Sequence, residues 1–83
     1  MTQKALFQEI ISWGEEYKTT GRLSQKWERL EVLEKECKRM LKGKPSKGKR
    51  DVLQHIISWA NTGSIFFDEL NEMTNKSHQI LGG

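Results

Sequence analysis

The apolar residues of this chain recur at intervals of three and four along most of its length, and this spacing constrains the fold more than any other feature. It is clearest in residues 24–42, where the apolar side chains would form one stripe along an α-helix. The core positions of that stripe are Leu23, Leu30, Leu33, Cys37 and Met40. No stretch shows the sustained alternation of apolar and polar residues that is typical of a strand. We therefore expect an all-α fold without a sheet.

The same spacing predicts three further helices, each bounded by residues that favour caps or turns. The four predicted helices cover about residues 2–18, 24–42, 49–61 and 64–81. Thr2 and Ser64 can cap the starts of the first and fourth helices. Gly21 and Gly43 are expected to end the first and second helices. The predicted core stripe of the fourth helix is Phe66, Leu70, Met73, Ser77 and Ile80.

The turn residues divide the chain into two α-hairpins of one domain, residues 1–83. The first hairpin covers about residues 2–42, the basic linker residues 43–48, and the second hairpin about residues 49–81. The sequence Ile-Ile-Ser-Trp occurs in both, at residues 10–13 and 56–59, so we expect both tryptophans to lie in similar core positions. The prediction is a four-helix bundle built from two α-hairpins joined by a basic loop.

Half of the basic residues lie in one short stretch that contains no acidic residue. We call this stretch, Lys38 to Arg50, the basic segment. Its seven cations are Lys38, Arg39, Lys42, Lys44, Lys47, Lys49 and Arg50. Residues 1–37 carry a net charge of −1 and residues 51–83 a net charge of −3, so the overall charge of +3 arises entirely from this segment. Concentrated charge of one sign attracts partners of the opposite sign.

Several partners could meet the basic segment. Clustered cations bind phosphates in a salt-sensitive way without sequence specificity, so DNA or RNA is the leading candidate. An acidic protein offers the same complementarity, and a solvated loop that only favours solubility is the plain alternative. Attraction to a membrane surface is weaker, because no helix rich in both aromatic and basic residues accompanies the cluster. The segment contains no aromatic residue on which a base could stack.

Motifs for catalysis or cofactor binding are weak. Residues 43–49, GKPSKGK, approach the P-loop pattern, but Arg50 stands where a hydroxyl must hold Mg²⁺. His55 and His78 have no partner at metal-ligand spacing, and Cys37 falls at a core position, where cysteine behaves as a small apolar residue. We expect a protein that is not an enzyme and uses neither a metal nor a cofactor.

The helix predicted over residues 24–42 carries more apolar side chains than a small bundle easily covers. Beyond the core stripe, Trp27, Val32 and Leu41 extend onto neighbouring faces. These three residues form the predicted protein interface, which would serve a homodimer or a partner helix. The alternative is that such residues are scattered singly over the surface, as many apolar residues are.

The single cysteine and an N-terminal apolar run too short for a signal peptide favour a cytoplasmic protein that does not insert into a membrane. The leading prediction is a small binding or regulatory protein that docks on nucleic acid or a nucleoprotein complex through the basic segment. The alternative is an adaptor that assembles through the helix of residues 24–42, with the basic segment contacting an acidic protein.

Overall fold

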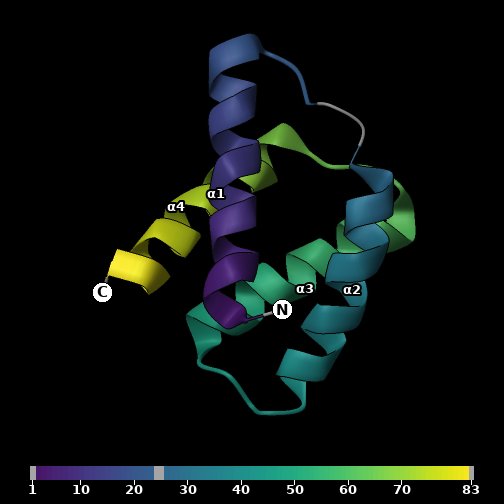
Figure 1. Cartoon of the computed structure of the whole chain (residues 1–83), viewed down its shortest axis with the longest axis vertical. Coiled ribbons are helices and arrows are strands. Elements are labelled where there is room, and N and C mark those ends of the chain that lie inside the picture. The colour runs from purple at the N-terminus through teal and green to yellow at the C-terminus, as the bar shows by residue number, and fades with distance from the viewer. Residues whose placement is uncertain (1, 24–25, 83) are drawn as a thin grey trace.

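The protein folds into four helices, as the computed structural model in Figure 1 shows. The structure describes residues 2–23 and 26–82. The helices are α1 (Gln3–Thr20), α2 (Trp27–Leu41), α3 (Lys47–Thr62) and α4 (Phe67–Gly82). No strand is found in the described residues, so the predicted all-α four-helix class is confirmed.

The closest helix pairs are α2 with α3, α1 with α4, and α3 with α4. The predicted first hairpin, α1 with α2, is not among them. Across that gap the two helices are joined by polar contacts, with Arg29 2.6 Å from Glu9 and Lys26 3.4 Å from Glu16. Residues 42–46 join α2 to α3, and the buried stripe of α2 packs against α3 rather than α1. The basic loop is therefore the turn of a hairpin.

Local signals at the helix ends explain several boundaries. The Thr2 hydroxyl accepts a hydrogen bond of 3.1 Å from the amide of Ala5, as predicted for an N-cap. Gly21 ends α1 in the left-handed region with φ of 71°, where glycine carries no steric cost. The predicted starts of the last two helices need correction. The third begins at Lys47 rather than Lys49, and the fourth at Phe67 rather than just after Ser64.

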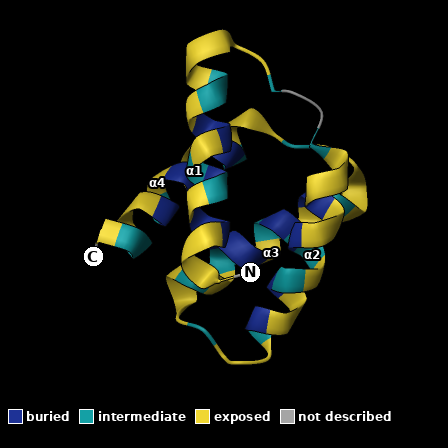
Figure 2. Ribbon diagram, viewed as in Figure 1, coloured by how far each residue is buried: buried dark blue, intermediate teal, exposed yellow. Residues whose placement is uncertain are grey.

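The core is a single cluster drawn from all four helices, seen as the dark ribbon faces that point inward in Figure 2. Trp13 and Trp59 are both buried, and the two Ile-Ile-Ser-Trp copies repeat one pattern of burial. Phe66 departs from the predicted stripe of the fourth helix. Its side chain is 57% exposed, because it precedes the first residue of α4 and so does not share the inward face of that helix.

The helices α1 and α4 approach closely at Gly14, a buried glycine that follows Trp13. A Cβ placed on Gly14 would lie 2.8 Å from Cγ2 and 2.9 Å from Cβ of Thr74, and closer still to its hydroxyl oxygen. Thr74 cannot turn its hydroxyl away freely, because this group donates a 2.7 Å hydrogen bond to the carbonyl of Leu70. The α1–α4 contact therefore depends on the absence of a side chain at residue 14.

This contact predicts the effect of a single methyl group. Gly14→Ala should lower the free energy of unfolding by about 1–3 kcal/mol, because overpacking outweighs the gain in helix propensity. Gly48→Ala is the matched control, since Gly48 is also helical but has nothing within 4 Å of its Cβ position. The control should leave stability unchanged or raise it by up to about 1 kcal/mol. Urea unfolding followed by circular dichroism measures both, and equal stabilities for the two variants would contradict the close contact.

Candidate nucleic-acid interface

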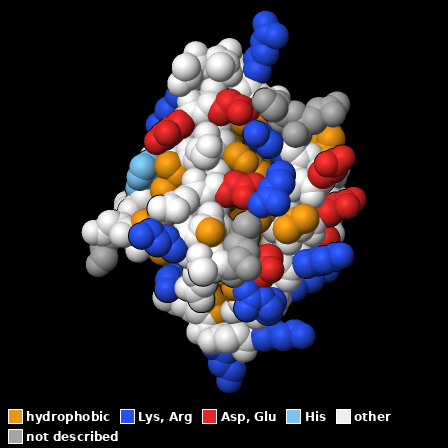
Figure 3. All heavy atoms as spheres, in the orientation of Figure 1, with side chains coloured by type: hydrophobic (Ala, Val, Ile, Leu, Met, Phe, Trp, Pro, Cys, Tyr) orange, Lys and Arg blue, Asp and Glu red, His pale blue; other side chains and the backbone are white. Residues whose placement is uncertain are grey.

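The cations of the basic segment come from three adjoining pieces of backbone at one end of the molecule. They lie on the last turns of α2, in the loop of residues 42–46 and on the first turn of α3. Figure 3 shows Lys and Arg side chains gathered over the lower part of the molecule, where Figure 1 places the α2–α3 loop. The helix ends and the loop therefore bring these cations to one end of the molecule.

Two of the seven cations are engaged by carboxylates of their own helix. The Lys38 ammonium lies 3.7 Å from Glu34, and the Arg39 guanidinium donates to Glu36 at 2.7 and 2.9 Å. The hydrogen bond from Arg39 lowers the pKa of the Glu36 carboxyl below its usual value. These intrahelical pairs weaken the contribution that Lys38 and Arg39 can make to binding an external anion.

The other five cations have no ion pair within the described chain, and we call them the open cations. They are Lys42, Lys44, Lys47, Lys49 and Arg50. Four of them are exposed, while Lys49 is half-buried and donates a 3.3 Å hydrogen bond to the neutral side-chain oxygen of Gln3. The structure therefore leaves five positive charges at one end of the molecule without an ion pair among the described residues, although Asp51, one turn after Lys47, attracts Lys47 electrostatically.

A surface hollow lies beside the first turns of α3, with a volume of about 750 Å³. Its lining combines open cations with residues that the sequence analysis did not single out. The lining residues are Lys47, Gly48, Arg50, Asp51, Gln54 and Lys76. Gln54 and Lys76 lie outside the basic segment. Gln54 could be found from the helical period, because it lies one turn after Arg50 in α3, whereas Lys76 lines the hollow only because α4 packs against α3.

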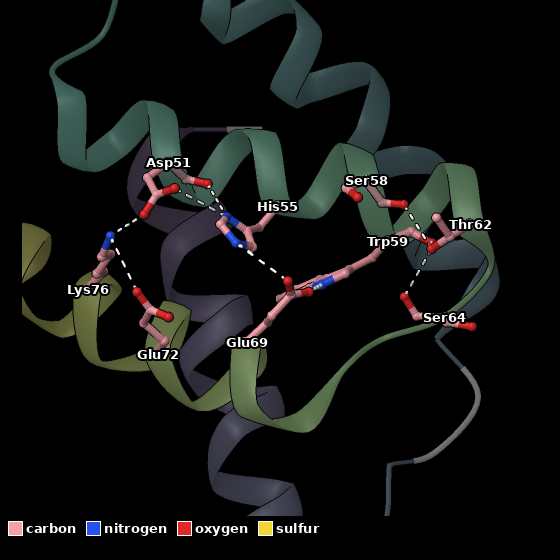
Figure 4. Close-up of polar contacts among 9 residues, drawn as sticks. All are labelled: Asp51, His55, Ser58, Trp59, Thr62, Ser64, Glu69, Glu72 and Lys76. Atoms are coloured by element: carbon pink, nitrogen blue, oxygen red, sulfur yellow. Dashed lines mark hydrogen bonds and ion pairs between the residues drawn. The ribbon is translucent and has the colours of Figure 1, made fainter.

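Polar contacts hold α3 against α4 along one side of this hollow (Figure 4). Asp51 pairs with Lys76, and this hydrogen bond is the main cause that lowers the pKa of Asp51 and raises the pKa of Lys76. His55 Nδ1 lies 2.8 Å from the carbonyl oxygen of Asp51, so this nitrogen carries a hydrogen. The indole of Trp59 donates a 2.9 Å hydrogen bond to Glu69. His55 is thus half-buried and hydrogen-bonded within α3.

The three predicted interface residues do not share one face. Trp27 is 47% and Val32 44% exposed, whereas Leu41 packs against the core. At 100° per residue, Trp27 and Val32 point about 140° apart around α2. Trp27 instead borders a hollow of about 340 Å³ together with Ile65 and Phe67.

Two exposed aromatic side chains, Trp27 and Phe67, line that second hollow, and Phe66 precedes Phe67 in the chain. We call Trp27, Phe66 and Phe67 the aromatic end. Phe67 stacks on Tyr17 with ring centroids 4.0 Å apart, while Phe66 is the most exposed large apolar residue of the described chain. Trp27 opens α2 and Phe67 opens α4, so each is separated from the α2–α3 loop by the length of a helix, about 20 Å.

The remaining candidates for chemistry do not assemble into a site. Cys37 is buried, and this burial raises the pKa of its thiol to about 12, which removes the reactive thiolate at neutral pH. His78 is exposed on α4. Among residues 2–23 and 26–82, no group of histidine, cysteine and acidic side chains could hold a metal ion, and no helix has the length and apolarity to cross a membrane.

Comparisons with protein-family models, with curated proteins and with solved structures find no match to this chain. The site must therefore be interpreted from its own residues.

The Asp51–Lys76 pair predicts a specific response to acid. A carboxyl whose pKa is lower in the folded state stabilises the fold above its unfolded pKa, near 4, and that stabilisation is lost as pH falls through the folded pKa. Asp51→Asn should therefore lower the urea midpoint at pH 7 and reduce its fall between about pH 4 and pH 2. Glu15→Gln is the control, because Glu15 is exposed and makes no ion pair among the described residues. Parallel pH profiles for wild type and Asp51→Asn would refute the stabilising role of the pair.

Proposed function

We propose that this protein binds nucleic acid through the open cations at the α2–α3 end. The observation that carries the proposal is the set of five cations at one end of the molecule, none of which forms an ion pair among the described residues. Unpaired cations occur elsewhere too, for example Lys18 and Lys35, but these lie on different helices. A phosphate backbone supplies closely spaced negative charges, and its contact with these side chains would release condensed counterions.

The arrangement favours contact with phosphates over stacking on bases at this end. The open cations come with no exposed aromatic neighbour, because the aromatic end lies about a helix length away. Base stacking is the usual source of affinity for single strands. Four or five neutralised phosphates would give log–log plots of affinity against salt with a slope between about −3 and −4.5.

Removal of three open cations tests the proposal. In Lys44→Gln/Lys47→Gln/Lys49→Gln, the salt slope should flatten by roughly one unit per lost contact, whatever the base sequence. Folding should survive, because none of these side chains is buried. Fluorescence anisotropy of labelled duplex and single-stranded DNA at several salt concentrations measures the slope.

A control variant separates a local contact from a general charge effect. Lys18→Gln/Arg22→Gln/Lys35→Gln removes the same charge from exposed residues outside the basic segment and should keep most of the wild-type slope. A wild-type protein that binds no nucleic acid at about 50 mM salt would refute the proposal. The open cations would then be better explained by an acidic protein partner.

A second candidate function, assembly with a protein, is favoured by the aromatic end. Its three side chains are between 43% and 57% exposed, and large half-exposed aromatic residues are enriched at protein interfaces. This candidate revises the interface predicted from the sequence: it keeps Trp27, sets aside Val32 and Leu41, and adds Phe66 and Phe67. A homodimer is the simplest form of such assembly.

Self-association at the aromatic end can be tested by sedimentation equilibrium at tens of micromolar protein. We expect a reversible dimer that Trp27→Ser/Phe66→Ser weakens, because each change removes exposed apolar area. Val32→Ser is the control, since Val32 is equally exposed but lies on another face of α2. A dimer held by apolar contacts should persist at high salt, where electrostatic attraction is screened. A strictly monomeric wild type would remove the homodimer from consideration.

A further inference from the structure

The outer face of α3 carries a continuous stripe of exposed polar side chains. We call this the α3 stripe, and its members are Lys47, Arg50, Gln54, Ser58 and Asn61. Successive members are three or four residues apart, so at 100° per residue they fall within an arc of about 80°. From Lys47 to Asn61 the stripe is about 21 Å long at 1.5 Å per residue.

The side chains of the α3 stripe form no hydrogen bond or ion pair within the described chain. Two of them are cations from the basic segment, and three are amides or a hydroxyl that follow along the same face. Arginine pairs with the O6 and N7 of guanine, glutamine and asparagine with the N6 and N7 of adenine, and serine with either kind of base. The stripe therefore places groups suited to base edges directly after groups suited to phosphates.

No acidic residue belongs to the α3 stripe. The nearest along the helix is Asp51, which lies about 60° around α3 from the middle of the stripe and is engaged by Lys76 of α4. The carboxylate of Glu69 accepts the hydrogen bond of the Trp59 indole, as Figure 4 shows on the flank of α3. These pairings reduce the repulsion that an approaching phosphate would meet beside the stripe.

We infer that α3 enters the major groove of double-stranded DNA and reads base edges with Arg50, Gln54, Ser58 and Asn61. This inference rests on the proposed function and names its ligand more closely. The major groove of B-form DNA is about 12 Å wide and admits one α-helix, whereas the major groove of duplex RNA is too deep and narrow. The helix α3 begins directly after the cationic loop of residues 42–46, so its start would lie beside the phosphates that border the groove.

The helix α4 is less suited than α3 to enter the groove, because its start is acidic. Its first turn presents Asp68 and Glu69, which phosphates would repel. The acidic start of α4 and the cationic start of α3 point to different roles for these two neighbouring helices. In this arrangement α4 supports α3 from the side, and Lys42 and Lys44 of the α2–α3 loop contact the backbone next to the groove.

Selection from a pool of randomised duplex DNA tests the inference with the whole 83-residue chain. At about 150 mM salt, where non-specific contacts are weakened, we expect enrichment of a short sequence motif. Gln54→Ala and Asn61→Ala should each reduce the preference for the selected motif over its single-base variants by roughly tenfold at one position, while the salt slope stays unchanged. Gln8→Ala, an exposed amide on α1, should leave both quantities unchanged.

The outcomes distinguish base reading by α3 from binding of nucleic acid through the open cations. Salt-dependent binding without any enriched motif, or a motif that survives unchanged in both Gln54→Ala and Asn61→Ala, would overturn reading by α3 and leave the proposed function in place. Equal affinity for duplex RNA would overturn it as well, since the α3 stripe cannot reach bases there. Absence of any nucleic-acid binding at about 50 mM salt would refute both statements.

Discussion

The short connection between α2 and α3 is the constraint on which the proposed site depends. Residues 42–46 join the two helices, so the basic end of α2 and the basic start of α3 lie together. Like charges on neighbouring residues repel one another and oppose compaction. The folded chain relieves only part of this repulsion, because Asp51 attracts Lys47 but is hydrogen-bonded to Lys76, while Glu34 and Glu36 are engaged by Lys38 and Arg39. A polyanion would relieve it directly.

Other contacts hold α3 in a defined position next to the open cations. Lys76 anchors Asp51 at the start of α3, and Glu69 receives the indole of Trp59 farther along the helix. Both partners belong to α4, which is in turn fixed against α1 where Gly14 meets Thr74. A helix supported in this way on its inner faces presents its outer face rigidly. Rigid presentation matters for binding, because less conformational entropy is lost when the partner docks.

Much of the fold was predictable from local spacing. The period of apolar residues identifies all four helices, and it correctly places Trp13, Trp59 and Cys37 in the core. Helix pairing was not predictable in the same way, because the stripe of α2 fits α1 or α3 equally well and only the packed structure distinguishes them. Phe66 shows the limit at helix ends, where a shift of the start by a few residues moves a side chain from the core to solvent.

Only part of the candidate site was predictable from the sequence, because some of its features arise from packing. The basic segment stands out as a run in the sequence, but the difference between paired and open cations depends on which carboxylates lie one turn away. Gln54, Ser58 and Asn61 are spaced like the face of any solvated helix, so their sequence carries no signal of binding. Their significance arises only because they continue the line of Lys47 and Arg50 on an otherwise packed helix. Lys76 joins the site through tertiary packing alone.

The proposed contact of nucleic acid with the α2–α3 end and the outer face of α3 can be mapped residue by residue. The measurement is a titration of ¹⁵N-labelled protein with short duplex DNA, followed by amide chemical shifts. We expect the largest changes between Lys42 and Arg50 and at Gln54, Ser58 and Asn61, with little change at Trp27 or Phe66. Shifts concentrated on α4 or the aromatic end, or no shifts at about 50 mM salt, would contradict it.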